Sequence, residues 1–220
     1  MSVNETAAAH GTADARRVAV LVSGHGSNLE ALLAAGPALG LRVVLVVSDR
    51  PGVRALGIAA GAGIDTEVVD FAGWADDRAG FDRALRDRVA AAAPDAVCLA
   101  GFMRILGPDF IRAFGARVVN THPSLLPAFR GAHAVRDALH YGVKLTGCTI
   151  HLVDEQVDHG PVLLQAAVEV LPDDDEASLH ERIKAVEHRL LPQAVALVAN
   201  GRVRLDGRRA LITELIRGGP

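Results

Sequence analysis

Short, continuous apolar runs alternate with helix-like segments along the first 120 residues, and this alternation constrains the fold more than any other feature of the chain. An apolar run without interspersed polar residues is typical of a strand that is covered on both faces. Such strands are expected at residues 18–22, 43–47, 66–69, 96–100 and 117–120, with helices from residue 27 and at 53–60, 76–93 and 108–114. Repeated strand–helix units predict a doubly wound α/β fold with a mostly parallel sheet.

The pattern changes after residue 120. Two late strands are expected, and the short turn between them favours an antiparallel pair. We also expect two helices, of which the second should kink at Pro192, and a terminal hairpin. The segments concerned are strands 146–153 and 162–170, helices 133–140 and 177–200, and hairpin 203–212. No internal repeat or linker is found, so we expect a single domain over residues 18–220 after a flexible tail at residues 1–17.

Composition and charge exclude several classes of protein. Half of the residues are hydrophobic and 22% are charged, as in a soluble globular chain. The formal net charge of -3 gives no electrostatic case for a nucleic-acid or anionic-membrane partner. Cys98 and Cys148 lie far apart in apolar surroundings, which fits free thiols in a reducing compartment. We therefore expect a cytoplasmic protein with small-molecule partners, and leave a homodimer open.

The loop at residues 24–28 is the first chemical signal. Glycines between a strand and a helix let the backbone approach an anion, which the free N–H groups and the helix dipole then bind. Ser27 stands three residues before Glu30, the spacing of a capping box, so an ordinary capped turn is the alternative interpretation. A phosphate site here would use Gly26, Ser27 and Asn28.

A dinucleotide-binding fingerprint is a further alternative for this loop. Asp49 ends the second expected strand, where a ribose-binding acid would lie. However, Leu29 occupies the position of the third glycine of that motif. The pattern therefore favours a simple phosphomonoester over a dinucleotide.

Two later motifs carry polar groups that suit acyl-transfer chemistry. Asn120 and His122 follow the fifth expected strand, at the edge where open α/β sheets place their sites. Asp158 lies on the turn between the two late strands, and a carboxylate beside His122 would orient its imidazole. A metal site of His122, His133 and Asp158 can be drawn, but no metal-binding spacing supports it, so we expect that no metal is required.

Four stretches together resemble the folate-dependent formyltransferases, and among them the members that act on 5′-phosphoribosylglycinamide. The resemblance covers roughly residues 17–201 and rests on the segments Ser23–Leu29, Leu99–Leu106, Asn120–Pro127 and Asp158–Pro161. It implies transfer of a formyl group from 10-formyltetrahydrofolate, as co-substrate, to the glycinamide amine in purine synthesis. It also implies that Asn120 and His122 stabilise the oxyanion and that Asp158 moves the proton.

The resemblance implies roles for further residues. Arg78 would lie near the substrate phosphate, and Glu187 would contact a ribose hydroxyl; a solvated surface charge is the alternative for each. His133 would support the site from behind the reacting groups. The folate pterin would be received by Met103, Arg104, Ile105 and Leu106. One departure is His159, which stands where a small residue is more usual.

Three alternatives to this function remain open. In the first, the chain is another folate-dependent enzyme of formyl transfer or formyl hydrolysis. In the second, it is a non-catalytic nucleotide- or folate-binding module. In the third, it is an NAD-dependent oxidoreductase. The presence of Asn120, His122 and Asp158 together argues for catalysis, and Leu29 argues against a dinucleotide.

Overall fold

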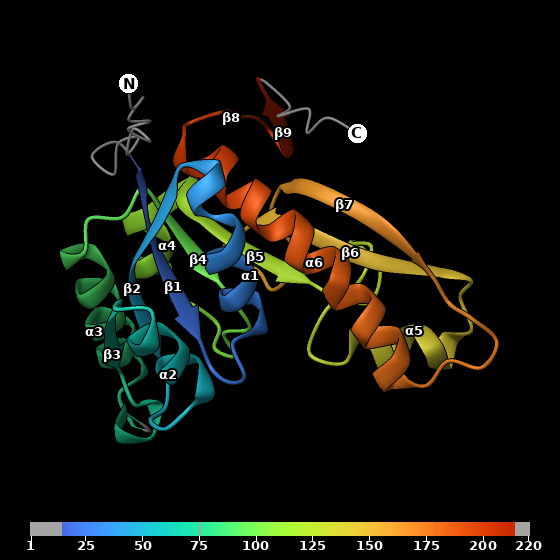
Figure 1. Ribbon diagram of the computed structural model, residues 1–220, viewed down its shortest axis with the longest axis horizontal. Coiled ribbons are helices and arrows are strands. Elements are labelled where there is room, and N and C mark those ends of the chain that lie inside the picture. The colour runs from blue at the N-terminus through green and yellow to red at the C-terminus, as the bar shows by residue number, and fades with distance from the viewer. Residues whose placement is uncertain (1–14, 75, 214–220) are drawn as a thin grey trace, which may run out of the picture.

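A seven-stranded sheet forms the centre of the molecule in a computed structural model that describes residues 15–74 and 76–213 (Figure 1). The strand order is β3-β2-β1-β4-β5-β6-β7. The five strands β3, β2, β1, β4 and β5 are parallel to one another, whereas β6 runs antiparallel to both β5 and β7. The predicted doubly wound, mostly parallel sheet with late antiparallel strands is therefore confirmed.

The sheet strands are β1 (Arg16–Val22), β2 (Leu41–Ser48), β3 (Asp65–Val68), β4 (Ala96–Leu99), β5 (Val118–His122), β6 (Leu145–Leu152) and β7 (Val162–Glu169). The helices are α1 (Ser27–Ala35), α2 (Arg54–Gly61), α3 (Arg78–Ala91), α4 (Pro108–Phe114), α5 (Ala134–Tyr141) and α6 (Glu176–Ala199), with 3-10 turns η1 (Pro37–Leu39), η2 (Phe71–Trp74) and η3 (Gly115–Arg117). A separate hairpin of β8 (Val203–Asp206) and β9 (Arg209–Ile212) follows, as the sequence predicts.

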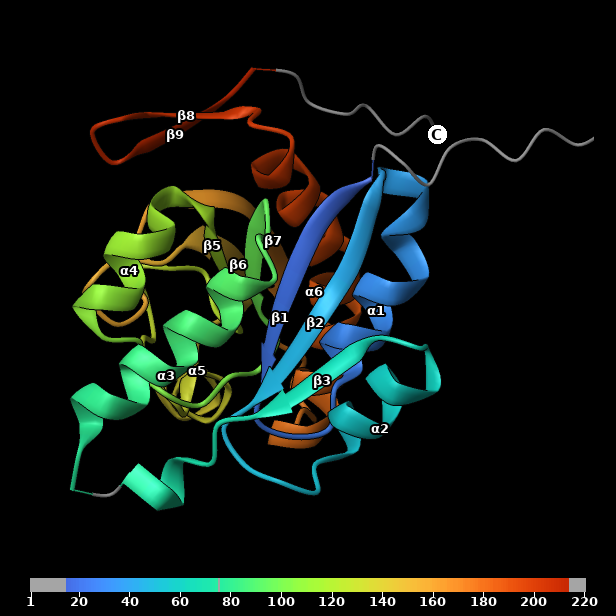
Figure 2. The same cartoon turned by 90° about the vertical axis from the view of Figure 1, so that its left-hand side faces the viewer.

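Two hydrophobic cores, one on each face of the sheet, explain the continuous apolar runs. In β1, Val18, Val20 and Val22 pack with α1, α2 and α6. The alternate residues Ala19 and Leu21 pack with α3 and α4 on the other face. Figure 2 shows α3 and α4 on one side of β1 and β2, with α1 and α2 on the other. Every position of β1 from Val18 onward is buried, so no polar alternation is needed.

Three local expectations need correction or refinement. Arg16 and Arg17, assigned to the tail, belong to β1, because they pair with β2 and the Arg17 N–H donates to Asp95 Oδ2 over 2.7 Å. The remaining tail, residues 1–14, lies outside the described residues. Helix α6 continues through Pro192, which is buried within it. The alternative interpretation of residues 24–28 as a turn capped by Ser27 does not hold, because the N-cap of α1 is Gly26 and no side chain caps the helix.

Both cysteines are free and buried. Burial raises the pKa of the Cys98 and Cys148 thiols to about 12, so neither forms a thiolate at neutral pH. Within the described residues, no helix is long and apolar enough to span a membrane.

Candidate active site

Asn120, His122 and Asp158 converge beside the end of β5. The Nδ1 atom of His122 lies 3.3 Å from Asp158 Oδ2. Asn120 lies two residues before His122 on β5, and its amide Nδ2 lies 3.2 Å from Nε2 of His151 on the adjacent strand β6. That same His151 Nε2 lies 3.8 Å from Asp158 Oδ1. The structure thus brings the three predicted side chains into one cluster, together with a histidine that the sequence analysis did not single out.

Both ring nitrogens of His122 face acceptors. Its Nε2 lies 2.7 Å from the backbone carbonyl of Phe129, and a carbonyl only accepts, so Nε2 carries a proton. A carboxylate also only accepts, so the contact of Nδ1 with Asp158 is a hydrogen bond only when Nδ1 is protonated as well. The imidazole is 4% exposed, which keeps this arrangement out of bulk water.

The turn that carries Asp158 is strained and closely packed. Asp158 has a φ of 49°, in the left-handed region that side chains other than glycine rarely adopt. The backbone N–H of Gly131 donates to Asp158 Oδ2 over 2.8 Å. Two residues later, a Cβ on Gly160 would stand 1.8 Å from the Leu152 carbonyl oxygen, so only glycine fits there. The surrounding contacts hold Asp158 in place against this strain.

His151 is the residue that sequence reasoning missed. Its Nδ1 lies 2.8 Å from the Leu152 carbonyl, so Nδ1 donates and the neutral Nε2 accepts from Asn120. Burial lowers the pKa of His151, which favours this neutral form. The available signal was a histidine in a strand whose other residues are apolar or small, namely leucine, isoleucine, cysteine, glycine and threonine. Its meaning depends on the antiparallel register, which pairs His151 with Asn120.

The glycine loop leaves the start of α1 open to an anion. Gly26 has a φ of 84°, and a Cβ at this position would lie 2.9 Å from the Ala55 Cβ. Glu30, the expected capping partner of Ser27, instead pairs with Arg54 over 2.6 Å. Because no side chain caps the helix, its first N–H groups remain available to a bound phosphate.

Glu187 is a buried residue and not a surface charge. It projects from α6, is 5% exposed and accepts a hydrogen bond from Thr121 Oγ1 over 3.0 Å. Burial raises the pKa of Glu187, and Thr121 and the side chain of Asn28, at the start of α1, oppose this by favouring the carboxylate. Glu187 thus connects the glycine loop to the strand that carries Asn120 and His122.

The expected folate segment presents two apolar side chains to solvent. Met103 and Ile105 are 65% and 62% exposed, whereas Leu106 is buried. Arg104 turns toward the sheet and pairs with Asp49 over 2.6 Å. Asp49 is fully buried in that ion pair, which is not the free ribose-binding acid of the dinucleotide alternative.

Arg78 and His133 make no described contact with the glycine loop or with the Asn120–His122–Asp158 cluster. Arg78 donates to the Ile105 carbonyl and pairs with Asp82 over 3.2 Å, because the start of α3 meets the loop after β4. The structure therefore groups Arg78 with the folate segment and not with the glycine loop. His133 precedes α5 with its side chain exposed, and no described contact joins its imidazole to the cluster.

His159, which stands where a small residue is more usual in the family, contacts the β8–β9 hairpin. His159 Nδ1 lies 2.7 Å from Asp154 Oδ2 on the same turn. Arg208, at the hairpin tip, reaches His159 Nε2 over 2.8 Å and donates to the His159 carbonyl over 2.6 Å. The hairpin therefore touches the turn that carries Asp158.

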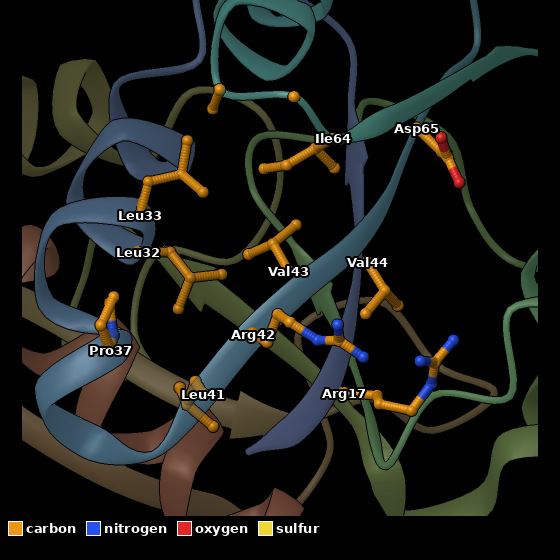
Figure 3. A pocket seen from close by; sticks show the side chains of 12 residues that line it. Arg17, Leu32, Leu33, Pro37, Leu41, Arg42, Val43, Val44, Ile64 and Asp65 are labelled. Carbon is orange, nitrogen blue, oxygen red and sulfur yellow. The ribbon is translucent and has the colours of Figure 1, made fainter. Parts of the chain in front are cut away.

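The Asn120–His122–Asp158 cluster lies apart from a hollow on the surface, and the described residues form no metal-binding group. Among the described residues, no group of three or more His, Cys, Asp or Glu side chains is placed to hold a metal ion. A hollow of about 540 Å³ lies between α1 and the strands β2 and β3, lined by residues such as Leu32, Val43 and Ile64 (Figure 3). None of the predicted site residues lines this hollow.

The fold and the Asn120–His122–Asp158 cluster define a formyltransferase, and the chain belongs to that family: the formyl transferase model matches residues 16–195. Within it, the chain is 52% identical over 206 residues to phosphoribosylglycinamide formyltransferase of Mycobacterium tuberculosis, across 92% of this chain and 94% of that protein. The expectation of a formyltransferase enzyme similar to this group is confirmed.

Two further relatives support the same family. The solved glycinamide ribonucleotide transformylase 1 of Symbiobacterium toebii superposes with a TM-score of 0.88 at 45% identity, covering 92% of this chain and 96% of that one. The chain is also 49% identical over 190 residues to the trifunctional purine biosynthetic protein adenosine-3 of Drosophila melanogaster. That match takes in 84% of this chain but only 14% of the longer protein.

Proposed function

We propose that this protein transfers a formyl group from 10-formyltetrahydrofolate to the amine of 5′-phosphoribosylglycinamide, a step of purine synthesis. The observation that carries the proposal is the convergence of Asn120, His122 and Asp158 in one partly buried cluster. The relatives include a phosphoribosylglycinamide formyltransferase and a glycinamide ribonucleotide transformylase, which supports this choice of substrates. We further propose a cytoplasmic enzyme with small-molecule partners and no nucleic-acid or membrane partner.

The cluster supplies the groups that formyl transfer needs. The glycinamide amine attacks the formyl carbon, a new C–N bond forms and negative charge develops on the formyl oxygen. The Asn120 amide donates to that oxygen through the N–H that does not face His151, and a protonated His122 joins it when the substrate displaces one of its two protein contacts, to Phe129 or to Asp158. As the bond from carbon to folate N10 breaks, Asp158 takes the proton lost by the amine and delivers a proton to N10, directly or through water. Metal chemistry has no step in this scheme.

The ends of the site bind the two substrates. The N–H groups around Gly26, Ser27 and Asn28 hold the phosphate, and the Glu187 carboxylate accepts from a ribose hydroxyl. The exposed Met103 and Ile105 with the backbone of Arg104 and Leu106 receive the pterin, since a flat ring needs apolar walls and backbone hydrogen bonds. Arg78 belongs to this folate side because it contacts the Ile105 carbonyl.

The test is a paired product assay with purified protein and both substrates. We expect formylated glycinamide ribonucleotide and free tetrahydrofolate to appear in equal amounts. Free formate in place of the formylated nucleotide would favour formyl hydrolysis. That outcome has a structural basis, because the solved formyltetrahydrofolate deformylase of Pseudomonas syringae superposes with a TM-score of 0.83 at 27% identity, over 92% of this chain and 67% of that one.

A further inference from the structure

A chain of hydrogen bonds crosses the molecule between the glycine loop and β6. Thr121 Oγ1 lies 3.6 Å from the Cys148 Sγ on β6 and 3.0 Å from Glu187 Oε1 on α6. The side chain of Asn28, at the start of α1, interacts with the same Glu187 carboxylate and stabilises its charged form. We name this chain of Cys148, Thr121, Glu187 and Asn28 the Thr121 bridge. It joins four elements of the fold through one hydroxyl and one carboxylate.

The donors and acceptors of the bridge have a fixed direction. Burial raises the pKa of the Cys148 thiol to about 12, so the sulfur keeps its proton and can donate it. A carboxylate only accepts, so the Thr121 hydroxyl must direct its hydrogen to Glu187 and use a lone pair toward Cys148. The hydroxyl therefore has one orientation, and the carboxylate oxygen Oε1 is held by it.

Thr121 also has a distinctive place on β5. It lies between Asn120 and His122, and side chains of successive strand residues point to opposite faces. Asn120 and His122 face the Asp158 cluster, whereas Thr121 faces α6 and Glu187. One strand thus connects the reacting groups on one face to the substrate-side carboxylate on the other.

We propose that Thr121 is a positioning residue, which fixes the Glu187 carboxylate for the phosphoribosyl part of the substrate and ties the glycine loop to β5. The inference rests on the proposed function, because it assigns Glu187 to that substrate. Thr121 itself touches neither the formyl group nor the folate in this scheme. Its loss should therefore weaken binding of the glycinamide substrate more than it slows transfer.

A dependence on pH follows from the same geometry. Burial favours the neutral form of Glu187, and the hydrogen bonds from Thr121 and Asn28 and the positive charge of Lys184 on α6 oppose it. The buried Cys148 thiol is the titratable group that reaches this network from β6. Removing the Thr121 hydroxyl should raise the pKa of Glu187 further, so that Glu187 becomes protonated and loses its negative charge at a higher pH.

The test compares Thr121→Val, which keeps the shape but removes the hydroxyl, with Thr121→Ser, which restores it. We expect Thr121→Val to raise the KM for phosphoribosylglycinamide about tenfold, the lower end of the loss of a hydrogen bond to a charged group. Turnover and the KM for formyltetrahydrofolate should change by less than about twofold. The acidic limb of kcat/KM for the glycinamide substrate should move to higher pH, and Thr121→Ser should return both values toward wild type.

Thr146→Val is the matched control. Thr146 lies on β6, is 1% exposed, and its hydroxyl has no hydrogen-bond partner among the described residues. We expect wild-type kinetics from it, and similar thermal unfolding of all three variants would show that the fold is intact. An unchanged KM and pH profile in Thr121→Val would overturn the proposal, as would an equal loss in Thr146→Val.

Calorimetric titration with ribose 5-phosphate separates this inference from the proposed function. We expect Thr121→Val to bind ribose 5-phosphate more weakly than wild type and Thr146→Val to bind it equally well. If the wild type bound this probe but formylated no glycinamide, the proposed reaction would fail while the positioning role stood. If the wild type formylated glycinamide and Thr121→Val matched it in both assays, only the positioning role would fail.

Discussion

The glycine loop and the Asn120–His122–Asp158 cluster are built in different ways. The loop gains its anion-binding geometry from consecutive residues, with Gly26 at a φ of 84° and helix α1 directly after it. The cluster is assembled from two strands and a turn, and its Asn120–His151 contact spans 31 residues of sequence. The glycine loop would bind an anion through backbone N–H groups, so its function depends on whether a side chain blocks the approach to them. The cluster would act through side chains, so its function depends on which residues the fold brings together.

The largest expected effect separates the chemistry of the cluster from binding at the loop. Asp158→Asn keeps the size of the side chain but removes the proton acceptor, so kcat should fall roughly 10²–10⁴-fold. The KM for phosphoribosylglycinamide should stay within about twofold, because the loop is untouched. Single-turnover transfer measures the first effect and titration of the substrate the second. Asp154→Asn, on the same turn, is the control, and an equal loss there would reduce Asp158 to a structural role.

A second experiment asks whether the cluster acts as one unit. Asn120→Ala and His122→Ala each remove an oxyanion donor, and each should lower kcat roughly 10²–10³-fold. The double variant should lose less than the product of the two single losses, since cooperating groups are not additive. Fully multiplicative losses would show that the two side chains act independently.

The loop should respond to shape and not to charge. Gly26→Ala places a Cβ 2.9 Å from the Ala55 Cβ and forces a left-handed φ on alanine. We expect the KM for phosphoribosylglycinamide to rise roughly tenfold with the KM for formyltetrahydrofolate unchanged. Gly24→Ala is the control, because a Cβ there meets no atom within 4 Å. Thermal unfolding of both variants separates lost binding from lost stability, and equal KM increases for both substrates would contradict the assignment.

The smallest expected effect is a loss of folding stability at acidic pH. Burial lowers the pKa of His151 below its ordinary 6.5, so below that pH the unfolded chain binds a proton that the folded protein resists. The free energy of unfolding should therefore fall as the pH drops below about 6.5, by up to about 1.4 kcal/mol per pH unit for this residue. Denaturant unfolding of His151→Gln should show a shallower dependence. Some slope should remain, because burial also lowers the pKa of His180 and His188.

Most of the fold could be predicted because its signals are local. Runs such as Val18–Val22 are apolar at every position, and the sheet covers both of their faces. The glycine loop was predictable for the same reason. Ser27 shows the limit of this reasoning, since its capping spacing was present but Glu30 binds Arg54 on another helix.

The environments that could not be predicted depend on contacts distant in sequence. Glu187 could be assigned to the substrate only by resemblance, because its burial and its hydrogen bond from Thr121 arise only when α6 packs on the sheet. His151 gains meaning only from its register against Asn120. Arg78 was assigned to the phosphate, but tertiary packing places it against Ile105.

The contact of Arg208 with His159 has a consequence for how each molecule is made. A ribosome adds Arg208 49 residues after His159. At roughly 5–20 residues per second, several seconds pass between the two. During translation, the turn that carries Asp158 therefore emerges before the hairpin that fastens it from outside. The strained turn at Asp158 therefore receives this support only after the turn itself has been made.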